Sequence, residues 1–358
     1  MRTRFSMSVL SIAVLALATS VAAQTPFTIG GVTAQPGTKV SGELTVPARG
    51  ADGGTTIPFS ILNGAKAGPV LTLVAATHGA EYPPVLALQR LRASIDPKDL
   101  SGTVVMVHVA NMPAFLGRAI YYTPGDHKNL NRVFPGKADG TISERIADVI
   151  TREIIDHTQY LIDLHCGDAN ESLRPYLYWT INASPALVES IRQLTLAFGL
   201  DHIVLDNGRP TDPAASLYLE NTAITRGKAG MTIESGAMGQ SDEESIQRIE
   251  RGVAGVLRHL KMRTTGPDPI EHPVFLGRNL VINSQHTGIF YPAVERGHTV
   301  AEGALIGRIT DFAGTTVEEI RAPFAGEILY VIGTPPTTKG EPIAFLAAVA
   351  TPAEMPKR

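Results

Sequence analysis

Two apolar runs in the first half of the chain each end on polar residues. Val70–Ala76 leads into the motif His-Gly-Ala-Glu at positions 78–81, and the mostly apolar run Tyr160–Leu164 leads into His165. Short apolar runs of this kind are typical of buried strands. Because ligands bind at the carboxyl edge of open α/β sheets, we expect both strands to deliver their polar residues to one site.

Strand and helix patterns alternate around these two runs. Gly37–Pro47 and Thr55–Leu62 alternate polar and apolar residues on either side of a glycine-rich turn, which predicts a hairpin. Several other stretches have helical spacing. We therefore expect an α/β fold with a mixed sheet flanked by helices. The helices are predicted near residues 85–95, 141–157, 185–199 and 241–260, and further strands near residues 102–109 and 229–234.

The pattern changes at residues 264–269, which read Thr-Thr-Gly-Pro-Asp-Pro. Beyond this segment glycine and proline recur at short intervals, short β-type runs lie between them, and no helical spacing remains. This part of the sequence predicts a small all-β domain. We place the boundary here, with an α/β domain over residues 24–265 and a β-rich C-terminal domain over residues 266–358.

The first residues have the three parts of a secretory signal peptide. Arg2 and Arg4 supply the positive start, Met7–Ala18 is the apolar stretch, and small residues up to position 23 fit a cleavage site. The apolar stretch is too short to span a membrane. We expect residues 1–23 to be a signal peptide, the mature protein to be periplasmic or secreted, and no stable membrane insertion after the signal is removed.

Composition narrows the possible partners. The formal net charge of the 358 residues is −3, and nothing suggests a surface for nucleic acid. The single cysteine, Cys166, excludes an internal disulfide framework. Cys166 directly follows His165, so it is either a metal ligand, a nucleophile or a small buried side chain beside the site. The last interpretation is favoured because three other ligands are available.

His78, Glu81 and His165 form a candidate metal centre. Two imidazoles and one carboxylate are a set of three protein ligands that a catalytic zinc ion takes, with water in the fourth position. Alone, a His-x-x-Glu motif also arises by chance in solvated loops, and the second strand that ends in a histidine favours the metal. Asp163 precedes His165 by two residues on the same strand face and is a candidate for orienting this ligand.

Two further segments carry candidate chemistry. The polar segment 111–140 is long for a loop inside a compact domain, and such loops usually carry function. It contains the run Asn-Leu-Asn-Arg-Val-Phe-Pro-Gly at 129–136. The segment Thr-Ile-Glu-Ser-Gly at 232–236 ends a short strand on Glu234, where small neighbours leave space for a reacting group. A glutamate at a helix N-terminus is the simpler interpretation of Glu234 taken alone.

With these motifs in order, the chain resembles the succinylglutamate desuccinylase/aspartoacylase family of the zinc carboxypeptidase superfamily over nearly its whole mature length. The resemblance is carried by the motifs at 78–81, 129–136, 163–165 and 232–236, and the second is the most specific. It implies a zinc-carboxypeptidase-like mixed sheet. The C-terminal part resembles the barrel-sandwich hybrid of biotinyl and lipoyl carriers but lacks the Met-Lys-Met that accepts biotin, which implies a rim over the site.

By this resemblance His78, Glu81 and His165 would bind one Zn²⁺ per chain. Glu234 would be the general base and acid, taking a proton from water and giving it to the leaving amine. The residue that stabilises the oxyanion would be either Arg118, the nearest upstream arginine, or a tyrosine hydroxyl, because Tyr121 and Tyr122 occupy the neighbourhood where the family has an arginine.

The resemblance also implies a substrate. Asn131 and Arg132 would hold the carboxylate of an amino acid, for which the planar guanidinium is well shaped. We therefore expect a secreted zinc-dependent amidohydrolase that acts on a small-molecule N-acyl amino acid. A zinc carboxypeptidase acting on peptides or peptidoglycan fragments is the alternative with the same metal and base. A non-catalytic binding protein is a third possibility, which the complete set of ligands and Glu234 argues against.

Overall fold

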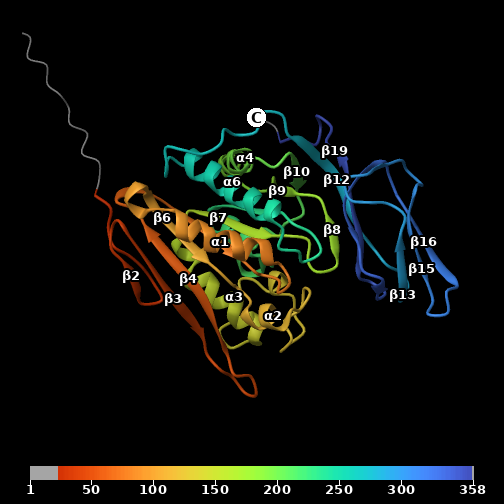
Figure 1. The fold of residues 1–358 in the computed structure, drawn as a ribbon, viewed down its shortest axis with the longest axis horizontal. Coiled ribbons are helices and arrows are strands. Elements are labelled where there is room, and N and C mark those ends of the chain that lie inside the picture. The colour runs from red at the N-terminus through yellow and green to blue at the C-terminus, as the bar shows by residue number, and fades with distance from the viewer. Residues whose placement is uncertain (1–22, 357–358) are drawn as a thin grey trace, which may run out of the picture.

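The computed structural model describes residues 23–356, which form a layered α/β part followed by a part built from strands alone (Figure 1). The predicted signal peptide, residues 1–23, lies outside the described residues except for Ala23. Among the described residues, no helix combines the length and the apolar character that a membrane crossing requires.

One mixed sheet of thirteen strands runs through the described residues. Its order is β3-β4-β6-β5-β7-β11-β9-β10-β12-β19-β17-β14, and β8 pairs with β17. The neighbours β6, β5, β7 and β11 are parallel, whereas β4 and β9 pair antiparallel with β6 and β11. The strands before the C-terminal part are β1 (Phe27–Ile29), β2 (Val32–Ala34), β3 (Thr38–Val46), β4 (Thr55–Asn63), β5 (Lys66–Ala75), β6 (Ser101–Val107), β7 (Tyr160–His165), β8 (Glu171–Leu173), β9 (Tyr176–Thr180), β10 (His202–Asp206) and β11 (Ala229–Glu234).

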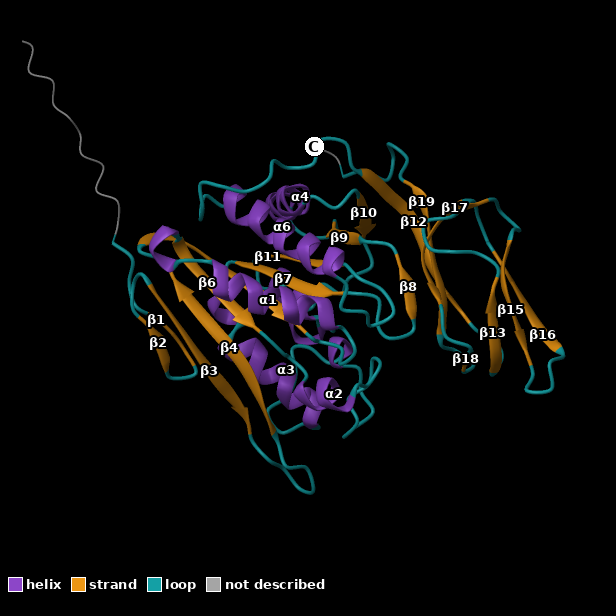
Figure 2. Cartoon of the chain, viewed as in Figure 1, coloured by secondary structure: helices purple, strands orange, loops and turns teal. Residues whose placement is uncertain are grey.

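Helices cover both faces of the parallel strands (Figure 2). Successive side chains of a strand point to opposite faces, so Leu73 joins an apolar cluster with α1, α4 and α6 while Val74 joins another with α3 and α5. Burial on both faces explains why these strands read as continuous apolar runs. The helices are α1 (Tyr82–Ser94), α2 (Met112–Gly117), α3 (Ile142–Glu153), α4 (Pro185–Phe198), α5 (Leu219–Ile224) and α6 (Glu243–His259).

The predicted mixed α/β sheet flanked by helices is confirmed. The hairpin forms with Thr38 opposite Asn63 and Val46 opposite Thr55. Helix α1 begins three residues before the predicted stretch, since two prolines suit its first turn, and α6 begins behind Asp242, whose carboxylate accepts the N–H of Ser245. The long polar segment 111–140 contains the short α2 and a 3₁₀ turn at Leu130–Arg132.

The irregular stretch before Gly227 holds elements that the pattern does not predict. Strand β10 and helix α5 lie in this stretch, between residues 200 and 227, whereas β9 precedes α4, and each of the three is only five or six residues long. Too few periods fit into such short elements for apolar spacing to reveal them. The pairing of β9 with β10, and of β10 with β12, extends the sheet toward the C-terminal part.

The C-terminal part contains only strands among its described residues, as expected. A separate sheet of order β16-β15-β13-β18 packs with β17 and β19 around its own apolar cluster, and it lies at the far end of the molecule in Figure 1. The proposed division at residue 265 stays a prediction. Strand β12, which follows this position, pairs in parallel with β10, which precedes it. The strands are β12 (Val274–Asn283), β13 (Gly288–Pro292), β14 (Thr299–Val300), β15 (Leu305–Thr310), β16 (Thr316–Arg321), β17 (Gly326–Ile332), β18 (Pro336–Thr337) and β19 (Pro342–Val349).

Candidate functional site

The two predicted strand ends lie side by side. Strands β5 and β7 are parallel neighbours in which Ala75 faces Leu164, so the segments that follow them meet at one edge of the sheet. The turn after β5 packs closely against α2: a Cβ on Gly79 would lie 2.2 Å from the carbonyl oxygen of Ala114. Only glycine fits there, which lets His78 and Glu81 stand on either side of a tight turn.

His78, Glu81 and His165 converge on one point. One ligand atom of each lies within 4.8 Å of the others. The Nδ1 atom of His78 is 2.9 Å from Glu81 Oε1, and the Nδ1 atom of His165 is 3.1 Å from the same oxygen. All three side chains are at most 11 % exposed. The two strands thus bring together the cluster that the sequence predicts.

Polar partners contact the far side of each imidazole. The Nε2 atom of His78 lies 3.1 Å from Asn129 Oδ1, and the Nε2 atom of His165 lies 2.8 Å from Asp163 Oδ2. Asp163 is itself held by a hydrogen bond from the hydroxyl of Thr77. Because these contacts hold the rings by Nε2, both Nδ1 atoms face Glu81, which is the arrangement seen for histidines that bind a metal.

The donor set fits a divalent metal such as zinc. Glu81 Oε2 is buried and has no hydrogen-bond partner among the described residues, so it has a free lone pair beside two imidazole nitrogens. Burial raises the pKa of the Glu81 carboxyl, but His165 and His78 outweigh burial and hold this pKa below its usual value. The carboxylate is therefore ionised, as a metal ligand must be.

Glu234 faces the same region from the neighbouring strand. It ends β11 directly opposite His165 in the parallel pair β7–β11, and it lines a cavity together with His78 and His165. Its Oε2 atom is buried and has no hydrogen-bond partner among the described residues. Burial raises the pKa of Glu234 well above its usual value, although the nearby His165 opposes this shift. A buried carboxyl with a raised pKa suits a group that both accepts and donates a proton.

The cavity has a volume of about 340 Å³ and reaches from the metal cluster to the C-terminal strands. Arg132 projects into it, is exposed, and makes no ion pair among the described residues. Its guanidinium lies over the ring of Tyr218, 4.6 Å from the centroid, and the guanidinium of Arg209 lies 3.9 Å from the same centroid. Arg132 is thus positioned and still available to an anion.

Asn131 and Arg118 lie in different surroundings. Asn131 lines the cavity but is buried, and its amide donates to Asp163 Oδ2 and accepts from the backbone N–H of Leu219. Arg118 ends α2 with a φ of 50°, is exposed, and is not among the residues that line the cavity. The predicted roles of both residues stay predictions.

Tyr121 lies beside the candidate ligands His78, Glu81 and His165. Its ring meets the ring of His78 edge-on at 5.8 Å, and its hydroxyl donates to the carboxylate of Glu171 at 2.5 Å. Burial raises the pKa of Glu171 to about 7 and that of Asp168 to about 6. Cys166 is buried and stands outside the ligand cluster, as expected for a small side chain beside the site.

Sequence reasoning missed part of the site. Asn129 holds a ligand histidine, although only its place in the run 129–136 marked it. Asp206, Arg209 and Tyr218 come from the stretch between residues 200 and 227, in which no elements were predicted. Strands β12 and β19 add Asn279, Val281 and Phe345 to the cavity wall, as expected for a rim formed by the C-terminal part. No residue pattern marks these side chains, since only the fold brings them to the cavity.

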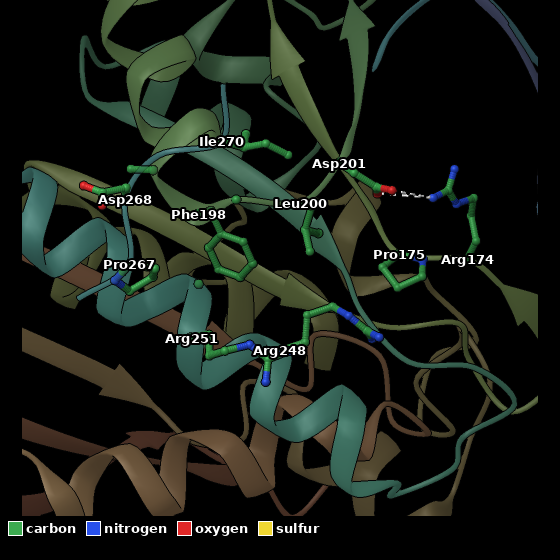
Figure 3. Close-up of a pocket in the computed structure, with 13 residues that line it drawn as sticks. Arg174, Pro175, Phe198, Leu200, Asp201, Arg248, Arg251, Pro267, Asp268 and Ile270 are labelled. Carbon is green, nitrogen blue, oxygen red and sulfur yellow. Dashed lines mark hydrogen bonds and ion pairs between the residues drawn. The ribbon is translucent and has the colours of Figure 1, made fainter. Parts of the chain in front are cut away.

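A second and larger groove, of about 540 Å³, lies away from the cluster (Figure 3). Arg248 and Arg251 project into it from α6, and Arg174 pairs with Asp201 across it. None of the candidate ligands lines this groove, and Arg174 also pairs with Glu327 at 2.5 Å. The chemistry is therefore assigned to the smaller cavity.

The sheet carries a cluster of two histidines and a glutamate at its carboxyl edge, and the half-buried Glu234 faces this cluster. Together these features define an α/β protein with a candidate metal centre. The chain belongs to the succinylglutamate desuccinylase/aspartoacylase family: residues 67–260 match the succinylglutamate desuccinylase/aspartoacylase catalytic domain.

Relatives agree over most of the chain. It is 30 % identical over 312 residues to an N-alpha-acetyl-L-2,4-diaminobutyric acid deacetylase from Halomonas elongata, covering 83 % of this chain and 87 % of the relative. The product-bound ectoine utilization protein EutE from Ruegeria pomeroyi superposes with a TM-score of 0.78 and 26 % identity, covering 91 % and 98 % of the two chains. A succinylglutamate desuccinylase from Silicibacter superposes with a TM-score of 0.77 and 27 % identity, and the match covers 91 % of this chain and 98 % of that chain.

Proposed function

We propose that this chain is a zinc-dependent amidohydrolase that removes the acyl group from a small N-acyl amino acid. The observation that carries the proposal is the convergence of His78, Glu81 and His165 with the facing Glu234 on one cavity that also holds Arg132. Family membership supports the reaction class, because the relative from Halomonas elongata is named as a deacetylase of an N-acetyl amino acid.

The residues divide the reaction between them. Zn²⁺ held by His78, Glu81 and His165 would supply Lewis-acid polarisation of the amide carbonyl and of water. Glu234 Oε2 accepts a proton from the attacking water and later donates it to the nitrogen of the leaving amine. Amide and water thus become a carboxylate and a free amino acid. Asp163 keeps His165 turned with Nδ1 toward the other ligands.

Arg132 binds the carboxylate of the amino acid in this proposal. It is the guanidinium in the cavity that has no carboxylate partner among the described residues, and its planar fork matches a carboxylate. For the oxyanion, neither candidate lines the cavity: Arg118 is exposed, and Tyr121, although its ring contacts His78, donates its hydroxyl to Glu171.

The carboxypeptidase alternative uses the same metal and base. The shape of the cavity favours a small substrate. Its volume is about 340 Å³, and β12 and β19 close one side, which leaves little room for an extended peptide. Release of C-terminal residues from peptides, with no deacylation of N-acyl amino acids, would favour the alternative.

The direct test is metal content together with hydrolysis of an N-acyl amino acid library, before and after chelation. We expect one zinc ion per chain, and activity that chelation removes and added zinc restores. Glu234→Gln should keep the metal and lose about 10²–10⁴-fold in kcat, since no other group shuttles the proton. Glu319→Gln, an exposed glutamate that pairs with Arg321, is the matched control. Full activity in Glu234→Gln would show that the base is assigned wrongly.

We further propose that the enzyme works in the periplasm or outside the cell after cleavage following Ala23. The charged start, the apolar stretch and the small residues before Gln24 support this. N-terminal sequencing of protein from fractionated cells should find Gln24 first, in the periplasmic or extracellular fraction. An uncleaved chain in the cytoplasmic fraction would contradict the proposal.

A further inference from the structure

The charges in the cavity are already assigned, apart from one. Arg209 lines the cavity, but its Nε atom lies 2.7 Å from Asp206 Oδ2 and 3.0 Å from Glu220 Oε1. The charge of Asp206 is therefore already balanced by Arg209, and Glu220, the second partner of Arg209, is buried. Among the lining residues that the structure describes, only Arg132 has a charge without an opposite partner, apart from Glu234, which moves the proton.

Aromatic rings cover Arg209 as well. Its guanidinium lies 3.9 Å from the ring centroid of Tyr218 and 5.5 Å from that of Tyr178, and only 12 % of its side chain is exposed. A guanidinium that is stacked on rings and whose charge is already balanced by two carboxylates attracts a further anion only weakly. Arg209 therefore supports the cavity wall and does not form a second anion site.

One side of the wall beyond Arg132 is apolar, although Asp206, Thr232 and Asn279 also line the cavity. Tyr178 and Phe345 stack with ring centroids 6.4 Å apart at an interplanar angle of 27°, and Val281 of β12 lines the same side. Val281 is 41 % exposed, so part of its apolar surface is in contact with water, which is unfavourable. An apolar group of a ligand placed against it would be shielded from water.

We propose that the substrate has one carboxylate, bound by Arg132, and that its remaining non-reacting part is uncharged and apolar, bound against Tyr178, Val281 and Phe345. This inference rests on the proposed function and specifies its substrate class. A second charge in the substrate would meet no unpaired partner in the wall and would lose its hydration, which costs more than an apolar contact supplies. The apolar group is either the amino-acid side chain or the acyl chain.

Two substrate series separate these sources. The first keeps the acetyl group and varies the amino acid through phenylalanine, leucine, glutamate and 2,4-diaminobutyrate. The second keeps glycine and varies the acyl group through acetyl, hexanoyl, phenylacetyl and succinyl. We expect kcat/KM to be about tenfold or more higher for apolar than for charged members in at least one series. Higher values for glutamate, diaminobutyrate or succinyl compounds in either series, without an apolar preference in the other, would overturn the inference while deacylation itself stands.

Charge variants of the wall test the placement. Val281→Lys should lower kcat/KM for the preferred apolar compound and raise it for its acidic counterpart, and Val281→Asp should raise it for the cationic one. Val317→Lys is the matched control, because Val317 is 39 % exposed on β16 and does not line the cavity. Unchanged selectivity in both Val281 variants would overturn the placement of the apolar group.

Binding provides a readout that does not depend on turnover. Calorimetry of the wild-type protein should give a lower Kd for whichever apolar product the kinetic series favours, phenylalanine or hexanoate, than for its charged counterparts glutamate or succinate. If no N-acyl amino acid is hydrolysed, the proposed function fails, and the inference fails too unless this order of Kd values is found. Equal or inverted Kd values with active deacylation would overturn the inference alone.

Discussion

At the scale of single residues, Asp163 links the sheet to the candidate metal centre. It is buried, lies 2.8 Å from His165 Nε2 and accepts hydrogen bonds from Thr77 and Asn131. We predict that Asp163→Asn weakens zinc affinity by about 10–100-fold, because the imidazole loses the partner that fixes its orientation. Titration against a zinc buffer measures this. Asp156→Asn, an exposed aspartate shortly before β7, should leave the affinity unchanged. Equal affinity in both variants would remove Asp163 from this role.

Tyr218 positions Arg132 in the same way. Its ring holds the guanidinium of Arg132 at 4.6 Å and that of Arg209 at 3.9 Å. We predict that Tyr218→Leu raises KM about five- to thirtyfold with little change in kcat, as expected when about 1–2 kcal/mol of cation–π interaction is lost. Tyr218→Phe keeps the ring and should restore KM. A fall in kcat at constant KM would assign Tyr218 to the chemical step.

The sequence predicts the cluster of candidate catalytic residues better than the residues that shape the cavity. His78, Glu81, His165 and Glu234 stand at strand ends that apolar runs mark, and the structure places all four together. The wall depends on the pairing of β10 with β12, between residues some 70 positions apart. No local pattern encodes such a contact, because it arises only when the sheet assembles.

At the scale of elements, His108 joins β4, β6 and α1. Its Nε2 atom shares a 2.8 Å hydrogen bond with the hydroxyl of Ser60, and its Nδ1 atom is buried with no partner in the described part of the chain. Burial and, to a smaller extent, the neighbouring Arg92 lower the pKa of His108 to about 4. The imidazole is therefore neutral in the folded protein over most of the pH range.

This depressed pKa predicts an acid-dependent loss of stability. The unfolded chain binds a proton below about pH 6.5 and the folded chain only near pH 4, so the contribution of neutral His108 is present above pH 6.5 and is lost as the pH falls. Between pH 7 and pH 5 the free energy of unfolding should fall by up to about 2 kcal/mol through this group. Urea unfolding measures this free energy for the wild type and for His108→Gln, and it should depend less steeply on pH in the variant. Identical slopes would contradict the prediction.

The turn between β5 and α1 is tied to α2 by Gly79. A Cβ at this position would meet the carbonyl of Ala114 at 2.2 Å, and backbone must shift to make room. We predict that Gly79→Ala costs about 1–3 kcal/mol of stability and also lowers zinc affinity, since both flanking ligands move. Thermal unfolding and metal content measure the two effects. Gly53→Ala in the β3–β4 turn, where a Cβ meets open space, should change neither.

Elements with several periods of apolar spacing are predictable from sequence, whereas short ones are not. The buried strand β5 and the amphipathic helices α3 and α6 appear where the pattern places them. Strand β12 escaped prediction because its burial pattern has no regular alternation and a glycine interrupts it. Its place in the sheet follows from tertiary pairing with β10 and β19, which overrides local preference.

At the scale of the whole molecule, one buried cluster spans the two parts of the chain. Tyr176 and Val204 pack there with Leu276, Leu329 and Phe345. We predict a single cooperative unfolding transition in calorimetry, because neither part buries this cluster alone. Leu276→Ala should shift the whole transition and cost about 2–5 kcal/mol. Two resolved transitions would show that the parts unfold independently.

Different strands supply the candidate reacting groups and the outer wall of the cavity, which affects how substrate selectivity can change in this family. The candidate reacting groups lie in the turn after β5 and at the ends of β7 and β11, while Asn279, Val281 and Phe345 reach the cavity from β12 and β19. Mutations in the C-terminal strands can therefore alter what is recognised without moving the atoms that react. Chimeras that exchange these strands between relatives would therefore test whether selectivity can be changed while the candidate catalytic residues stay in place.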